Sequence, residues 1–185
     1  MLHIKGTAVM DAMEAIKARA GREELEKILS LLDVEAQETF RGPLSLSSWY
    51  SCDAFARFLE VDIRETAGGN EKELIRRSEA VIEKQLSGIY KMFVKLGSPE
   101  FVIRRIAAVH STYFDGVQII PEMQGPKSAT IQYVGFSRNH RIMGFAIIGF
   151  FRKALEISGA KKVDVHFTVP IEAGEKFCEL ALSWD

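Results

Sequence analysis

Hydrophobic residues recur at helical spacing along the first two-thirds of the chain and at strand spacing along the last third. Breaks containing glycine, proline or serine separate the helical segments, and residues 33–48 are expected to form a loop around Gly42 and Pro43. His3 is expected in a flexible N-terminal segment. The predicted helices cover residues 7–20, a second segment around 25–32, then about 49–59, about 71–96 and 98–113.

The helix at 98–113 has a well-defined start, with Ser98 as N-cap, Pro99 at the first helical position and Glu100 in the first turn. His110 follows an apolar run near its end. Such a histidine is either a metal or haem-iron ligand or a core-edge histidine hydrogen-bonded to the backbone, and both interpretations stay open. No histidine pair and no His/Cys/Glu set has the spacing of a zinc site.

The last third predicts four strands, at 117–123, 129–136, 162–169 and 177–184. An apolar helix lies between the two pairs, and it is hydrophobic on all sides from 142 to 151. A helix of this kind should be buried. The ββαββ order predicts an α+β fold, in which N-terminal helices precede a four-stranded antiparallel sheet that packs its apolar face on helices.

At 185 residues, we expect a single domain over 1–185, with a helical part at 1–115 and an α+β part at 116–185. A formal net charge of -1 gives no general attraction to nucleic acid. We expect a cytoplasmic protein without membrane insertion. The two cysteines lie far apart, the N-terminus lacks the pattern of a secretory leader, and the longest apolar run is half as long as a helix needs to cross a bilayer. Phosphate loops, Rossmann glycines and nucleophile elbows are absent, so we expect no enzyme.

The start of the apolar helix carries the best candidate site. Arg138, His140 and Arg141 cluster there, where arginine forks and free helix N–H groups together favour an anion. The alternative is a solvated strand-to-helix turn. Gly144 costs helix stability, which close approach of a ligand or tight helix–sheet packing would offset. We expect a pocket between this helix, the sheet and the helices at 71–113.

The order of elements resembles the domain shared by haem-NO/oxygen-binding (H-NOX) sensors, vinyl-reductase-like regulatory domains and TRAPP vesicle-tethering subunits. The segments KGTAVMDAM, SWYSCDAFARFLE and KLGSPEFVIRRIAAVHSTYFDG, with the strand–helix–strand tail, are similar to an uncharacterised bacterial family best known from myxobacteria. The resemblance covers most of the chain and implies a sensing or interaction domain.

The H-NOX resemblance implies that His110, shortly before the Phe114-Asp115-Gly116 turn, matches the proximal haem ligand. Asp115 stands where that turn has proline. The second H-NOX signature, Tyr-x-Ser-x-Arg, holds the haem propionates, and the corresponding region here begins at Tyr133. The spacing differs from that signature: alignment on the following helix places Arg141 at its arginine. The predicted ligand-binding residues are therefore Arg138, His140, Arg141, Gly144 and Tyr133.

Three hypotheses follow. The preferred one is a non-catalytic ligand-sensing or regulatory domain without haem, which binds a small apolar or anionic molecule and passes its signal to a protein partner. The second is a haem-based NO or oxygen sensor, in which haem is the cofactor and His110 the iron ligand. The third is an interaction module without a ligand, like the TRAPP subunits, working as a homodimer.

Overall fold

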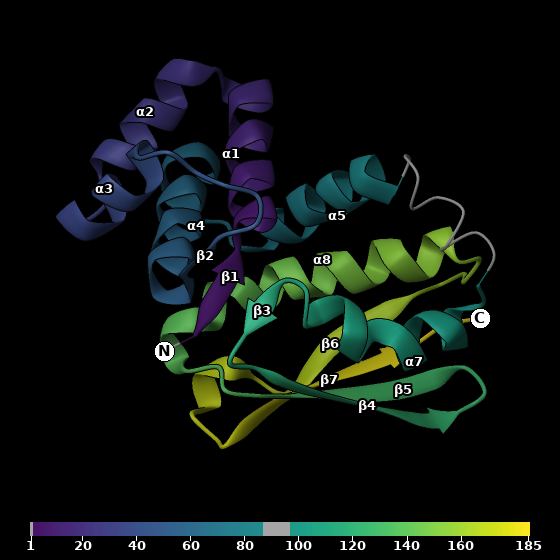
Figure 1. Cartoon of the computed structure of the whole chain (residues 1–185). Coiled ribbons are helices and arrows are strands. Elements are labelled where there is room, and N and C mark those ends of the chain that lie inside the picture. The colour runs from purple at the N-terminus through teal and green to yellow at the C-terminus, as the bar shows by residue number, and fades with distance from the viewer. Residues whose placement is uncertain (1, 87–96) are drawn as a thin grey trace.

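The structure, a computed structural model, describes residues 2–86 and 97–185. Its N-terminal part is a group of helices with a small three-stranded sheet at its base (Figure 1). The strands of this sheet run in the order β2-β1-β3, and all of them pair antiparallel. The elements of this part are β1 (His3–Lys5), α1 (Gly6–Ala20), α2 (Arg22–Ser30), α3 (Val34–Arg41), β2 (Trp49–Ser51), α4 (Cys52–Ala67), α5 (Lys72–Leu86) and β3 (Phe114–Asp115).

The C-terminal part is a four-stranded antiparallel sheet in the order β4-β5-β7-β6. Together with the helices it confirms the predicted α+β fold. Tyr133 of β5 faces Cys178 of β7 in the register of the central pair, and both side chains are buried. The remaining elements are α7 (Pro99–His110), β4 (Gln118–Gly125), β5 (Ser128–Val134), η1 (Arg138–His140), α8 (Arg141–Ile157), β6 (Asp164–Val169), η2 (Ile171–Ala173) and β7 (Phe177–Ser183).

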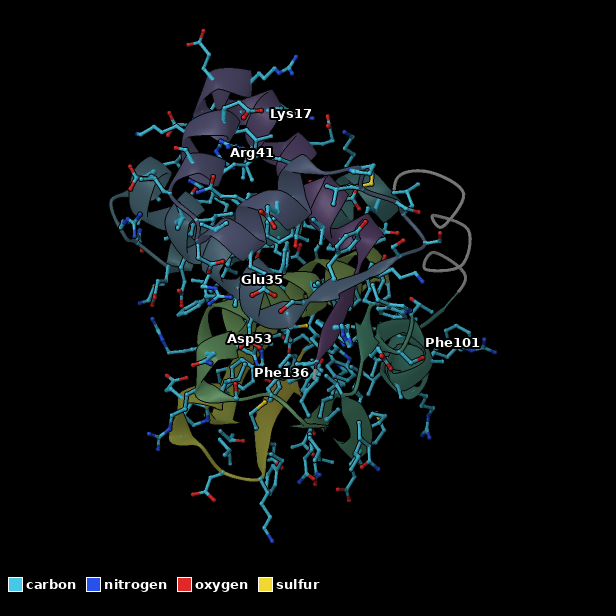
Figure 2. All side chains as sticks on the ribbon, turned by 60° about the vertical axis from the view of Figure 1, so that its left-hand side comes forward. Lys17, Glu35, Arg41, Asp53, Phe101 and Phe136 are labelled. Carbon is cyan, nitrogen blue, oxygen red and sulfur yellow. The ribbon has the colours of Figure 1, made fainter. Side chains whose placement is uncertain are left out.

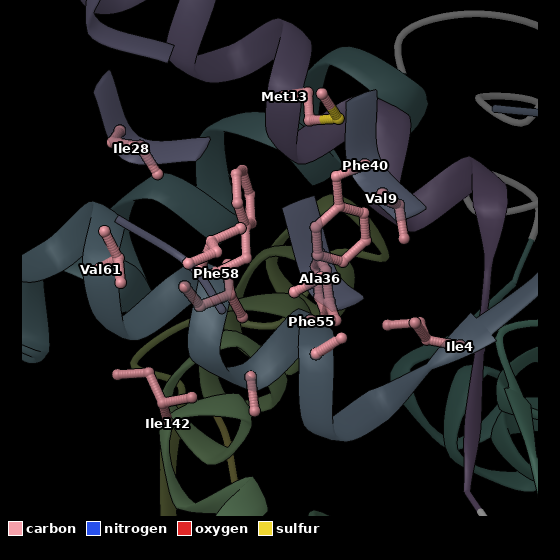
Figure 3. Close-up of a cluster of buried hydrophobic side chains, with 14 of the residues drawn as sticks. Ile4, Val9, Met13, Ile28, Ala36, Phe40, Phe55, Phe58, Val61 and Ile142 are labelled. Atoms are coloured by element: carbon pink, nitrogen blue, oxygen red, sulfur yellow. The ribbon is translucent and has the colours of Figure 1, made fainter. Parts of the chain in front are cut away.

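Helix α8 is apolar on all sides because it contributes to two cores. It crosses between the helical group and the sheet (Figure 1). Ile142 and Met143 join the helical core, and Figure 3 shows Ile142 in the same cluster as Phe58 and Val61. Ile147 and Phe151 belong to the second core, formed with the sheet and α7. The predicted burial of this helix is therefore confirmed.

The two glycines of α8 permit close packing on different neighbours. A Cβ added at Gly144 would lie 3.0 Å from the Phe167 ring of β6, so tight helix–sheet packing accounts for this glycine. A Cβ added at Gly149 would lie 2.8 Å from Cβ of Ser78, and closer still to the carbonyl oxygen of Ile75. Gly149 therefore lets α5, and not the sheet, approach α8.

Several predictions for the first half of the chain were wrong. His3 lies in β1, where it pairs with Ser51 and Asp115, so this segment is not flexible. The expected loop at 33–48 contains α3, because Asp33 caps that helix by accepting a hydrogen bond from the Ala36 amide. Residues 49–51 form β2, and the expected helix starts only after them.

Other helix boundaries agree with the pattern. Ser98 accepts a hydrogen bond from the Phe101 amide and caps α7 as predicted, although α7 ends at His110. The predicted helix at 71–96 is present as α5 up to Leu86, and its remainder lies outside the described residues. Within residues 2–86 and 97–185, every helix is too short or too polar to cross a bilayer.

Candidate functional site

A cavity of about 160 Å³ lies between the helical group and α8. One wall follows α1 from Ala8 through Ala12 and Ala15 to Arg19. Helices α4 and α5 form further walls, α8 closes the cavity opposite, and the end of α7 reaches it through His110. The predicted walls from α8 and from the helices at 71–113 are present, but the four-stranded sheet supplies none of the described lining residues of this cavity, and α1 and α4 take its place.

His110 is the buried polar residue at one end of this cavity. Its side chain is 3% exposed and is surrounded by the rings of Phe114, Tyr133, Phe150 and Phe151, with the closest ring centroid, that of Phe150, at 4.7 Å. Nδ1 lies 2.9 Å from the hydroxyl oxygen of Tyr133. Desolvation by these apolar neighbours lowers the pKa of His110 to about 3. The imidazole is therefore neutral at physiological pH.

Tyr133 positions the His110 ring rather than lining the cavity. It is completely buried, and burial raises the pKa of its hydroxyl group. Among the lining residues that the structure describes, Tyr133 is absent whereas His110 is present. The hydrogen bond occupies Nδ1 of His110 and leaves Nε2 as the ring nitrogen available to a ligand.

The opposite end of the cavity carries a charged cluster. Asp62 of α4 is 3% exposed, and its two carboxylate oxygens accept hydrogen bonds from Arg19 of α1 at 2.8 Å and Arg77 of α5 at 2.9 Å. The Thr66 hydroxyl donates to the same carboxylate at 2.9 Å. These side chains tie three helices together, and Arg19, Asp62 and Arg77 all line the cavity.

The predicted basic cluster does not enter this cavity. Arg141 pairs with Glu71 through both terminal nitrogens, and this partner raises the pKa of the guanidinium group. Arg138 lies against Gly174 and donates to the carbonyl oxygen of Ala173 at 3.5 Å. Neither arginine lines this cavity among the described residues, because acidic and backbone partners far along the chain bind them elsewhere.

Gly144 and Arg141 line a separate groove between α8, β6 and η2. Phe167 and Ile171 form its apolar floor, and His166 and Glu172 are its other polar side chains. Arg141 and Glu172 carry opposite charges here, and Arg141 already binds Glu71. The groove therefore offers an anion no unpaired cation among the described residues.

His140 closes the η1 turn onto α4. The backbone amide of Ser137 donates to Nδ1 at 2.9 Å, so Nδ1 is the acceptor and the neutral ring carries its proton on Nε2. Nε2 lies 3.5 Å from Asp53 of α4. Desolvation lowers the pKa of His140 although Asp53 opposes this. His140 thus caps a turn, and Figure 2 shows Asp53 and Phe136 at this junction of the two parts.

Sequence reasoning missed the charged cluster at Arg19, Asp62 and Arg77. One signal was available in the sequence, because Asp62 stands in the apolar stripe of α4, four residues after Phe58 and three after Leu59. A buried carboxylate of that kind needs a cation. Which arginines supply it depends on the packing of α1 and α5 against α4.

Haem would need a nitrogen ligand for its iron and cations for its propionates. His110 could ligate the iron, because its ring is neutral and Tyr133 holds its Nδ1 as outer partners of metal-bound histidines do. Arg141, the propionate partner implied by the H-NOX resemblance, is bound to Glu71 and lies outside the cavity. Arg19 and Arg77 do line it. His110 therefore suits the iron of haem, and Arg19 and Arg77, rather than Arg141, are the cations that could face its propionates.

No protein-family model matches this chain, and no curated protein sequence is significantly similar to it. Solved structures do match. An H-NOX protein from S. oneidensis in its Fe(II)NO state superposes with a TM-score of 0.74 at 12% identity, over 98% of this chain and 99% of that one. A variant of the K. algicida H-NOX protein gives a TM-score of 0.73 at 14% identity, over 98% and 97%.

An oxygen-binding H-NOX domain related to soluble guanylate cyclases is also similar, with a TM-score of 0.69 at 12% identity over 98% of this chain and 95% of that one. The chain therefore has the H-NOX fold, as the resemblance implied. The further resemblance to vinyl-reductase-like domains, to TRAPP subunits and to a bacterial family stays a prediction.

Proposed function

We propose that this chain, on its H-NOX fold, is a non-catalytic ligand-sensing domain whose cavity binds one small, largely apolar molecule. The cavity's position carries the proposal: α1, α4 and α5 from the helical part and α7 and α8 from the sheet part line the same space. A ligand held there contacts both parts, so its binding energy can favour one arrangement of them over another.

The chemistry of the described side chains supports a binding role rather than catalysis. His110 titrates at about 3, too low for an efficient general base at neutral pH. Burial raises the pKa values of Cys52 and Cys178 to about 12, which keeps both thiols protonated and poorly nucleophilic. Within residues 2–86 and 97–185, no cluster of histidine, cysteine and acidic side chains could hold a metal ion.

The cavity's volume favours a ligand much smaller than haem. At about 160 Å³ it resembles an engineered protein cavity of roughly 150 Å³ that takes up benzene. A porphyrin is several times larger than benzene, so haem would require the walls to separate. We therefore infer an apolar or weakly anionic small molecule as the primary ligand, and a protein partner as the receiver of the signal.

Thermal unfolding with a panel of apolar and anionic small molecules tests this function. Ala12→Phe fills the cavity from α1 and should abolish every stabilisation that a panel compound gives to the wild type. Ala18→Phe, on the exposed side of the same helix, is the matched control and should leave these responses intact. Equal responses in wild type and Ala12→Phe would show that the compounds bind elsewhere and contradict the proposal.

Haem sensing is the second candidate function, and His110 is the observation that favours it. When bound, haem would supply a site for a diatomic gas at its iron. His110 would ligate the iron, and Arg19 and Arg77 would face the propionates. Haemin added to the purified protein should then give a sharp stoichiometric Soret band that His110→Ala removes. A broad free-haemin band, or a Soret band unchanged in His110→Ala, would rule out this assignment.

Homodimerisation and the TRAPP-like interaction role stay predictions. Exposed apolar side chains such as Val34 and Phe101 offer contact area on separate helices, and Figure 2 shows Phe101 at the outer side of α7. Light scattering across micromolar concentrations tests the dimer, and a constant monomer mass would contradict it.

A further inference from the structure

The cavity is elongated and has chemically different ends. Its lining along α1 runs from Ala8 to Arg19, a distance of about 16 Å at the helical rise per residue. Gln85 of α5 donates to Asp11 of α1. Near the C-terminal end of α1, Arg77 and Arg19 meet on Asp62. Gln85 and Arg77 of α5 therefore lie beside different ends of the lining along α1.

The end at Arg19 is charged and lies nearer to solvent. The Arg19 side chain is 30% exposed, whereas His110 at the other end is 3% exposed. Between the ends the wall of α1 presents Ala8, Ala12 and Ala15, whose short side chains leave the space open. An apolar channel with a charged, partly hydrated mouth suits an amphiphile, because its chain leaves water while its head group stays near it.

The charged end holds more positive than negative charge. Arg19, Arg76 and Arg77 meet only the carboxylates of Asp62 and Glu73 in this cluster. Arg76 and Arg77 share Glu73, and Arg19 and Arg77 share Asp62, so three guanidinium groups face two carboxylates. Burial and the charge of Arg77 lower the pKa of Arg19 although Asp62 opposes this, so the charged form of Arg19 is incompletely compensated.

Hydrogen-bond donors also remain at this end. Arg19 binds Asp62 and Thr66 through one terminal nitrogen, and its other nitrogens have no acceptor among the described residues. Nε of Arg77 is buried without a hydrogen bond in the described part of the chain, with Glu73 at 3.5 Å. A guanidinium group offers five N–H donors in a planar fork that matches a carboxylate. The Asp62 carboxylate already accepts three side-chain hydrogen bonds.

We propose that the Arg19–Asp62–Arg77 cluster recognises the carboxylate of an unbranched amphiphile, whose alkyl chain lies along α1 and α5 toward His110. The inference rests on the proposed ligand-sensing function and names the ligand class of the same cavity. One surplus positive charge matches a monocarboxylate better than a phosphate monoester, which carries nearly two negative charges at neutral pH.

Calorimetric titration with decanoate and decanol tests the head-group site, because the two probes share a chain and differ in charge. We expect decanoate to bind the wild type at least tenfold more tightly than decanol, the ratio that one charge-assisted hydrogen bond supplies. Arg19→Gln, at the partly exposed edge of the cluster, should weaken decanoate by about tenfold or more and leave decanol unchanged.

Two further variants complete this test. Arg64→Gln is the matched control, since Arg64 is 60% exposed, pairs with Glu65 and does not line the cavity, and it should leave both affinities within about twofold. Arg77→Lys keeps the buried charge that Asp62 needs but loses the planar fork, so it should weaken decanoate while the protein remains folded. Thermal unfolding of each variant verifies the fold.

The outcomes separate the inference from the proposed function. If Arg19→Gln and Arg77→Lys leave decanoate affinity unchanged while Ala12→Phe abolishes binding of both probes, the cavity binds ligands but the cluster is not the head-group site. Equal wild-type affinities for decanoate and decanol, or no decanoate binding, likewise overturn the inference. Failure of the proposed function itself would appear as unchanged probe binding in Ala12→Phe.

Discussion

The hydroxyl oxygen of Tyr133 lies 2.9 Å from Nδ1 of His110, and this hydrogen bond joins the second strand of the sheet to the last turn of α7. Both side chains are almost completely buried. The bond therefore holds His110, the one histidine among the described lining residues of the cavity, in a fixed orientation.

Removing this hydroxyl should destabilise the protein. Tyr133→Phe leaves Nδ1 of His110 buried without a partner, so we expect a loss of about 1–3 kcal/mol in the free energy of unfolding, measured by urea denaturation. Tyr50→Phe is the control, because the Tyr50 hydroxyl accepts a bond from Ser45 at an exposed site and its loss should cost less. Equal effects of the two substitutions would contradict the assigned role of the buried bond.

Stability should fall with acid through His110. Its pKa is about 3 in the folded protein and near 6.5 in the unfolded chain, so the unfolded state binds the extra proton. The stabilisation is complete above pH 6.5 and is lost as the pH falls toward 3, by about 1.4 kcal/mol per pH unit. The lowered pKa of His140 acts in the same direction.

The variant His110→Gln isolates this contribution, because glutamine stays neutral and can still bond to Tyr133. We expect the free energy of unfolding, measured by urea denaturation between about pH 6 and pH 4.5, to fall less steeply in His110→Gln than in wild type. The difference in slope should correspond to roughly one proton taken up on unfolding. Identical pH slopes would mean that His110 is not buried as a neutral ring.

Asp62 should be essential for the packing of three helices. Asp62→Asn leaves Arg19 and Arg77 without their shared carboxylate, and removal of one member of a buried ion pair costs about 3 kcal/mol. Thermal or urea unfolding measures the loss. Glu14→Gln breaks an exposed pair with Lys17 on α1 and should change stability by less than about 1 kcal/mol. A similarly small effect at Asp62 would show that the cluster is not structural.

The two glycines of α8 should respond differently to alanine. Gly149→Ala places a methyl group against the backbone of α5, which cannot yield locally, so we expect a loss of about 1–3 kcal/mol despite the better helix propensity of alanine. Gly144→Ala meets the Phe167 ring, which can rotate, and should cost less. A larger loss of unfolding free energy in Gly144→Ala than in Gly149→Ala, measured by urea denaturation, would contradict the packing of α5 on α8.

The sequence predicted part of the candidate site. His110 was identified from its place on an apolar helix, and both of its open interpretations concern a buried ring. The structure adds a polar partner, Tyr133, which the sequence had placed among ligand-binding residues. The expected backbone bond is replaced by a side-chain bond from a strand 23 residues away, a pairing that local spacing does not encode.

Local spacing determined the burial of α8, the alternation of the C-terminal strands and the cap at Ser98, because each depends on residues within a turn or two of one another. Only the tertiary structure decided that α3 exists and that residues 3–5 form a strand with two distant partners. It also decided where the cations lie. Arg141 meets Glu71 across 70 positions, while Arg19 and Arg77 meet Asp62 across 43 and 15, and these long-range contacts place the charged end of the cavity at α1, α4 and α5 rather than at the start of α8.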